Sequence, residues 1–164
     1  MSVHNVVREI EAAQAAGYDL AIDWSTTDVD VDALTATSVA ADGAGGVTSS
    51  SGGVGYATGA GGTVTQSTNK ATTAALNKTT GAITMNAASL AAGATATFTL
   101  SNTAIAATDA VIVNHASAGT AAAYEVWAHT IAANSCQISV TNITAGALAE
   151  AIVLRFAVIK GVSA

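Results

Sequence analysis

The chain has 164 residues, a formal net charge of −6 and only 10% charged residues, and its single cysteine is Cys136. One cysteine excludes an intrachain disulfide framework, and no uninterrupted apolar run reaches the roughly 18 residues that a membrane helix needs. The first residues also lack the basic start and apolar stretch of a secretory signal, so we expect a soluble protein made in the cytoplasm.

The acidic residues are concentrated in the first quarter of the chain. Eight of the eleven carboxylates precede Gly43, where only Arg8 opposes them, and the rest of the chain is nearly neutral. Nucleic-acid binding requires basic side chains that displace counterions from phosphates, and the sequence has no basic stripe. An acidic arm instead suits docking onto a basic protein surface.

Residues 2–16 are predicted to form a short amphipathic helix that packs on another surface. Their apolar residues follow the i, i+3, i+4, i+7 spacing of one helix face, and a helix this short is marginal when alone in water. Residues 18–24 alternate weakly and are predicted to form an extended anchor. The contacts expected with another protein or subunit are Val3, Val6, Val7, Ile10, Tyr18, Leu20, Ile22 and Trp24.

The next two segments differ sharply in composition. Asp28–Asp32 alternates like a strand, yet Thr27 followed by Asp30 resembles a helix capping box; we favour a helix over residues 31–40. Residues 43–62 are rich in glycine and serine, which is typical of a flexible linker. We therefore predict three parts: an acidic helical anchoring arm at 1–42, a linker at 43–62 and a body at 63–164.

The body is predicted to be an antiparallel β-sandwich or jelly roll, so the whole chain is expected to be mainly β with a short N-terminal helical arm. Short alternating runs are separated by turn residues and have no helical run between them. Thr79–Gly81 is predicted to be the turn of a hairpin, and Ala92–Gly93 a second turn. The last run, Glu150–Lys160, should be a central strand buried on both faces. Strands are expected at residues 63–68, 72–77, 82–86, 94–101, 109–114, 123–131, 136–142 and 150–160.

Metal binding is not predicted at any position. Asp28–Asp32 carries three aspartates at the spacing of a calcium loop, but Ala33 and Val39 stand where that loop needs glycine and glutamate. His115 and His129 have no cysteine or histidine at metal-ligand spacing. A solvated acidic face and structural histidines are the better interpretations.

Catalysis is not predicted either. A Ser–His–Asp arrangement could be drawn with His115 and Asp109, but no Gly-x-Ser-x-Gly elbow accompanies it. Glu125 and Glu150 are the most plausible carboxylate pair for glycoside cleavage, and both fit surface positions. Cys136 alternates with apolar residues and is expected to lie in the core. We expect no catalytic residue and no cofactor.

Several strings in the body resemble a module of tailed-bacteriophage virion proteins. The resemblance covers residues 62–161, and such modules occur in structural, head-fibre, capsid-decoration and tail-fibre proteins. The strings are Gly62-Thr-Val-Thr-Gln, Leu76-Asn-Lys, Gly81-Ala-Ile-Thr-Met, Leu90-Ala-Ala-Gly, Phe98-Thr-Leu, Val113-Asn-His, Asn142-Ile-Thr-Ala-Gly and Phe156-Ala-Val-Ile-Lys-Gly.

The resemblance implies a non-enzymatic virion component that is assembled in the host bacterial cytoplasm. It would bind the major capsid protein or another virion protein as a decoration, cement or head-fibre subunit. A homotrimer is the implied oligomer, and neither nucleic acid nor a membrane is an expected partner. The alternative is a receptor- or carbohydrate-binding component of a tail fibre. That function needs exposed aromatic residues, for which the sequence offers Trp24, Trp127, Tyr56 and Tyr124.

Overall fold

Eight β-strands form the part of the chain that the structure describes. The computed structural model describes residues 55–56 and 59–161, and these residues contain strands and loops but no helix; accordingly, no helix among them could cross a lipid bilayer. The predicted helical arm at 1–42 and most of the predicted linker lie outside the described residues. The strands are β1 (Thr63–Thr65), β2 (Ala74–Ala75), β3 (Thr80–Thr84), β4 (Thr95–Ser101), β5 (Ala110–Ser117), β6 (Tyr124–Ala132), β7 (Ser135–Asn142) and β8 (Val153–Ile159).

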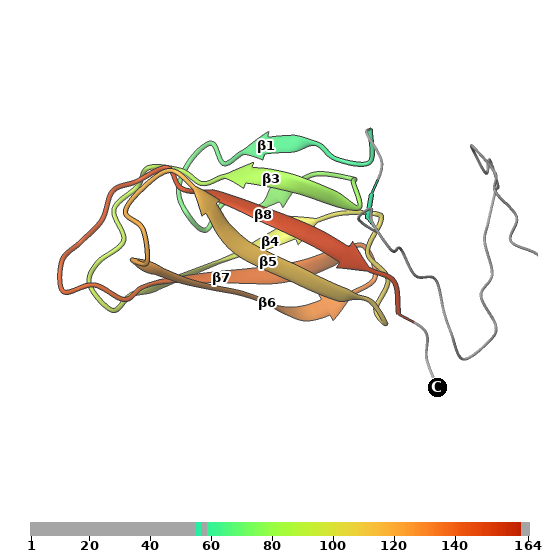
Figure 1. Ribbon diagram of the computed structural model, residues 1–164. Coiled ribbons are helices and arrows are strands. Elements are labelled where there is room, and N and C mark those ends of the chain that lie inside the picture. Colours follow the sequence, from blue (N-terminus) through green and yellow to red (C-terminus); the bar gives the residue numbers. More distant parts are fainter. Residues whose placement is uncertain (1–54, 57–58, 162–164) are drawn as a thin grey trace, which may run out of the picture. The chain divides into compact units, whose positions relative to one another are not determined.

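The strands form two four-stranded sheets that share one core (Figure 1). One sheet has the order β1-β3-β8-β5 and the other β2-β4-β7-β6. The pairs β1–β3 and β2–β4 are parallel, and all other neighbours are antiparallel. The prediction of a purely antiparallel body is therefore wrong, because the two short first strands each join an edge in the parallel direction.

Two glycines that both looked like turn residues have different roles. No hairpin turns at Thr79–Gly81, because β2 and β3 belong to different sheets. Gly81 lies within β3, where a Cβ atom would be 2.6 Å from Leu76 and 2.9 Å from the Gly62 carbonyl oxygen. This glycine allows close packing of neighbouring segments. The turn predicted at Ala92–Gly93 is confirmed, and its glycine has a φ of +68°.

β4 and β7 show the alternation that the sequence predicts. Phe98 and Leu100 of β4 lie opposite Ile138 and Cys136 of β7, and all four are buried. Burial of such apolar side chains is the dominant favourable term in folding. The buried apolar residues of the core are Ala74, Ile83, Met85, Leu90, Phe98, Leu100, Ile105, Ala123, Tyr124, Cys136, Ile138, Val140, Ile152, Leu154, Phe156 and Val158.

β8 is a central strand, as predicted, because β3 pairs with it on one side and β5 on the other. Leu154, Phe156 and Val158 are buried on its inner face. The prediction that both faces are buried is wrong: Arg155 and Ile159 are exposed on the outer face. Each sheet of a two-layer arrangement buries one face, and the other meets solvent.

The two long loops at one end of the body, residues 86–94 and 143–152, are joined by the side chain of Asn142 (Figure 1). Its Nδ2 atom donates to the carbonyl oxygens of Leu90 at 3.0 Å, Ala91 at 3.2 Å and Gly146 at 2.7 Å. Asn142 is completely buried. A buried amide that makes these bonds fixes both loops, since leaving it unpaired would be costly.

Replacing Leu154 by alanine tests the position of β8 in the core. The side chain is fully buried, so the change leaves a cavity and should lower the free energy of unfolding by about 2–5 kcal/mol. Ile143→Ala, in the loop after β7, is the matched control, because its side chain is 54% exposed and the change should cost less than about 0.5 kcal/mol. Urea unfolding measures both variants, and equal losses would contradict the burial pattern.

Candidate functional site

The residues that the sequence predicts to contact another protein all lie outside the described residues. The same is true of the aspartates in Asp28–Asp32. Within residues 55–56 and 59–161, no group of three or more His, Cys, Asp or Glu side chains is placed to hold a metal ion. The predicted contact residues are Val3, Val6, Val7, Ile10, Tyr18, Leu20, Ile22 and Trp24.

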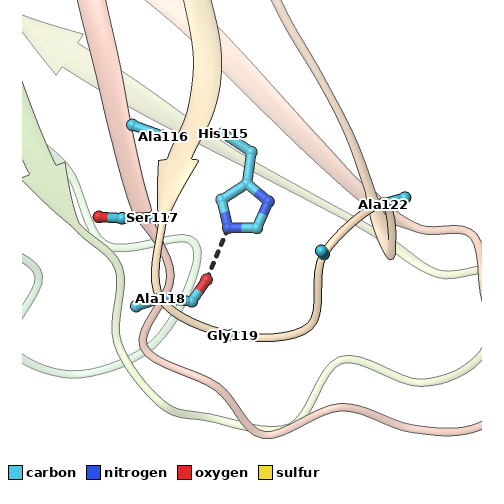
Figure 2. A pocket seen from close by; sticks show the side chains of 7 residues that line it. His115, Ala116, Ser117, Ala118, Gly119 and Ala122 are labelled. Carbon is cyan, nitrogen blue, oxygen red and sulfur yellow. Dashed lines mark hydrogen bonds between the residues drawn. The ribbon is translucent and has the colours of Figure 1, made fainter.

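A hollow of about 370 Å³ lies at the loop between β5 and β6 (Figure 2). The Nε2 atom of His115 donates to the carbonyl oxygen of Ala118 at 2.7 Å, which ties the strand end to the loop. Ala118 and Ala122 have φ angles of 59° and 56°, a region that alanine seldom adopts. The lining is mostly backbone and alanine. Ligand recognition requires several polar side chains that converge on the pocket, and this hollow has few.

Glu150 holds the loop between β5 and β6 in place through its carboxylate. Its carboxylate accepts hydrogen bonds from the Thr120 backbone N–H at 3.0 Å, the Thr120 hydroxyl at 2.7 Å and the Tyr124 hydroxyl at 2.7 Å. These bonds, led by the one from the Thr120 backbone, lower the pKa of Glu150. Burial, and then the bond to Glu150, raises the pKa of Tyr124. Both carboxylate oxygens of Glu150 are thus occupied in holding the loop.

Lys70 is a buried cation that contacts the backbone of Glu150. It is 4% exposed, and its Nζ atom donates to the carbonyl oxygens of Asn86 at 2.8 Å and Glu150 at 2.6 Å. Burial lowers the pKa of Lys70, and the charge of Glu150 partly opposes this shift. Hydrogen bonds to two carbonyls satisfy the buried ammonium and join segments that are far apart in the chain.

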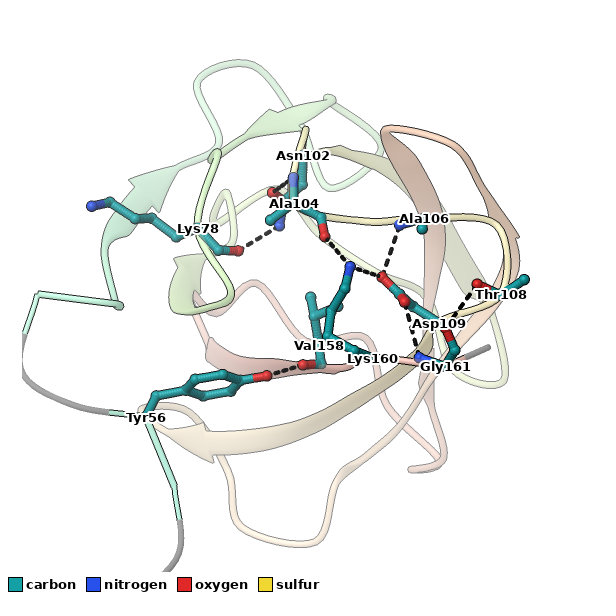
Figure 3. Close-up of polar contacts among 10 residues, drawn as sticks. All are labelled: Tyr56, Lys78, Asn102, Ala104, Ala106, Thr108, Asp109, Val158, Lys160 and Gly161. Carbon is teal, nitrogen blue, oxygen red and sulfur yellow. Dashed lines mark hydrogen bonds and ion pairs between the residues drawn. The ribbon is translucent and has the colours of Figure 1, made fainter. Parts of the chain in front are cut away.

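Asp109 holds the opposite end of the body together (Figure 3). Its carboxylate accepts from the Ala106 N–H at 2.8 Å, the Lys160 ammonium at 2.5 Å and the Gly161 N–H at 3.1 Å. The hydrogen bond from Ala106, followed by the one from Lys160, lowers the pKa of Asp109 to about 2. The carboxylate therefore stays ionised and anchors the segment that follows β8.

The structure separates the residues considered for catalysis. Asp109 precedes β5 and His115 lies near its far end, six positions away, which is about 20 Å along a strand. Glu125 is exposed on β6, whereas Glu150 is held in the loop contacts. Cys136 is buried, and burial raises the pKa of its thiol to about 11, so the reactive thiolate is disfavoured.

The outer face of β4, β7 and β6 carries a regular array of polar side chains around one tryptophan. The strand register places the residues in three rows across the sheet. We call these nine residues the polar face: Glu125, Thr141 and Thr95 in the first row, Trp127, Ser139 and Thr97 in the second, and His129, Gln137 and Thr99 in the third.

Hydrogen bonds connect the polar face across its three strands. The Ser139 hydroxyl lies 2.7 Å from the Thr97 hydroxyl and 2.9 Å from Nε2 of His129. The Thr95 and Thr141 hydroxyls are 2.7 Å apart. These bonds fix the orientation of the side chains, and Ser139, which makes two of them, is only 3% exposed.

The four predicted aromatic candidates have different environments. Trp127 is 42% exposed on the polar face, whereas Tyr124 is buried. Tyr56 is exposed, but its hydroxyl donates to the carbonyl oxygen of Val158, as Figure 3 shows. Trp24 lies outside the described residues. The array around Trp127 was not predicted, although the alternation of hydroxyl residues in β4 and β7 was its sequence signal.

Replacing Gly119 by alanine tests the tight contact under the loop. Its φ is +73°, and a Cβ atom would lie 2.6 Å from Ile152 and 2.9 Å from Glu150. Gly93→Ala is the matched control, because φ is +68° there and no atom lies within 4 Å. The control should lose about 1–2 kcal/mol through left-handed backbone strain alone, and Gly119→Ala about 1–3 kcal/mol more through overpacking. Urea unfolding that gave equal losses would contradict the contact.

Acid titration tests the role of Asp109. Its pKa is about 2 in the folded chain and 3.8 ordinarily, so the folded state binds fewer protons in this range. Its contribution to stability is therefore complete above about pH 4 and disappears as the pH falls toward about 2. Asp109→Asn should lower the free energy of unfolding at pH 7. The difference in free energy between this variant and the wild type should shrink as the pH falls from about 4 to about 2. A difference that stays constant in urea unfolding from pH 7 to pH 2 would contradict this role.

Comparison with known proteins supplies no relative for this fold or for the polar face. No protein-family model, no curated protein and no solved structure matches the chain.

Proposed function

We propose that the chain is a non-enzymatic structural subunit of a tailed-phage virion that binds the capsid surface as a decoration, cement or head-fibre protein. The arm at 1–42 attaches it to the major capsid protein or another virion protein. The body forms a jelly-roll-like β-sandwich and assembles as a homotrimer. The observation that carries this proposal is that the strings resembling virion proteins occupy positions on which the fold depends.

Two of these strings meet in space although they are far apart in the sequence. Leu90-Ala-Ala-Gly lies in one long loop, and Asn142-Ile-Thr-Ala-Gly begins the other. The Asn142 amide bonds to backbone carbonyls of both. A third string starts at Gly81, where no Cβ atom fits. The resemblance therefore involves residues that fix the architecture, which supports a shared fold. The shared role is proposed by analogy alone.

The composition of the body's surface also supports protein contacts. Residues 59–161 contain only seven charged side chains, and Lys70 and Asp109 among them are buried. Ile112 and Ile159 are 56% and 51% exposed, and the register of β5 and β8 makes them diagonal neighbours on one outer face, close enough for such side chains to touch. Interface cores are depleted in charge and enriched in apolar area, so this face is our candidate for trimer contacts.

Purified virions of the phage that encodes the chain test the proposal. Mass spectrometry should find the chain in many copies per particle, and antibody labelling in electron micrographs should mark the head. Absence of the chain from purified virions would exclude a virion function. Labelling of the tail alone would favour the alternative, a receptor- or carbohydrate-binding tail-fibre component.

Variants of the arm provide the matched control for this experiment. Val7→Asp and Ile10→Asp place a charge on the apolar side of the predicted helix and should remove most of the chain from the particle. Val47→Asp introduces the same charge in the predicted linker and should leave incorporation unchanged. Equal incorporation of all three variants would contradict the anchoring role of residues 1–42.

A further inference from the structure

The polar face differs from an ordinary exposed sheet surface in its arrangement. Trp127 is its only large apolar residue and is 42% exposed. Carboxylate, imidazole, amide and hydroxyl groups occupy the neighbouring outward positions of β6, β7 and β4. The imidazole of His129 lies beside the indole, with ring centroids 6.5 Å apart. Because β6 is the edge strand of its sheet, the indole has hydrogen-bonding groups on both sides along β6 and on the side that faces β7.

Some side chains of the polar face form hydrogen bonds within the protein, and others do not. Ser139 bonds to Thr97 and His129, and Nδ1 of His129 lies 2.9 Å from the Thr130 hydroxyl. Within residues 55–56 and 59–161, by contrast, the side chains of Glu125 and Gln137 have no hydrogen-bond partner. The first group orients the surface, and the second can bond to a ligand.

The charge of the face restricts the class of ligand. β4, β6 and β7 contain no lysine or arginine, and Glu125 is their only acidic residue. Phosphate groups and single-stranded nucleic acids require cations beside the stacking residues, and the carboxylate repels anions. Protein interfaces group several anchors in a desolvated centre, whereas Trp127 stands alone among polar groups. A neutral ligand with many hydroxyl groups fits this surface.

We propose that the polar face binds a neutral hexopyranose unit of an oligosaccharide, with the sugar ring stacked on Trp127. The π face of the indole carries negative potential and attracts the C–H groups on one side of the ring. Neighbouring strands lie about 4.8 Å apart and alternate residues of one strand about 7 Å apart, which brings the side chains of Glu125 and Gln137 within reach of hydroxyls at the edge of the ring. Glu125 accepts hydrogen bonds, and Gln137 both donates and accepts them.

Fluorescence of the full chain provides a direct test, because the sequence has only two tryptophans. Trp24→Phe makes Trp127 the single reporter. An array of neutral hexose and N-acetylhexosamine oligosaccharides identifies the probe, which is then titrated in solution. Binding should change the Trp127 emission, and Trp127→Ala, followed on the array, should weaken binding by about tenfold or more through loss of stacking. Glu125→Gln and Gln137→Ala should each weaken it less.

Ile143→Ala is the matched control, because this exposed residue lies in the loop after β7 and outside the polar face, and this variant should bind as the wild type does. Circular dichroism checks folding, and Trp127→Phe keeps an aromatic ring if the alanine variant does not fold. A blank array, or unchanged binding by Trp127→Ala, would overturn the inference. So would loss of an oligomer in Trp127→Ala without glycan binding, since the face would then be a subunit contact. None of these results bears on whether the chain is found in virions.

Discussion

The first sheet depends on the hydrogen bonds of β8, because β3 and β5 pair with this strand and not with each other. The paired residues are far apart in the sequence, since Thr80 of β3 lies opposite Ala157 of β8. β7 has the same position in the second sheet, between β4 and β6. The first sheet cannot form completely before β8 has paired, and the second cannot form completely before β7 has paired. The fold is therefore dominated by non-local pairing, which is typical of slowly folding β-proteins.

The parts of this fold that the sequence predicts are those with one buried face and a clear alternation. β4 and β7 are of this kind, because their apolar residues alternate with polar ones and lie on the buried face. Strand partners were not predictable in the same way. The alternation of apolar and polar residues indicates which face of a strand is buried, but not which other strand pairs with it. The short β1 and β2 therefore joined their sheets in an unexpected direction. Gly81 was misassigned because a glycine marks a close approach as readily as a turn.

Charged residues in the body are few, and three of them, Lys70, Asp109 and Glu150, connect distant segments. Asp109 joins the start of β5 to the residues after β8, and Lys70 and Glu150 join two loops to the β5–β6 connection. The sequence made Asp109 and Glu150 look like possible catalytic groups. Only the fold shows that backbone N–H groups and hydroxyls already occupy their oxygens, because these partners lie on loops whose paths local sequence does not determine.

The two outer faces of the body carry different chemistry, and folding alone does not require this difference. Side chains on an outer face contribute little to the shared core, so their character reflects what surrounds the protein. The first sheet presents Ile112 and Ile159, which suit contact with another protein subunit. The second presents Trp127 within an ordered set of polar groups, which suits a hydrated ligand. Because the faces lie on opposite sheets, a protein contact on the first face leaves the second face exposed to solvent.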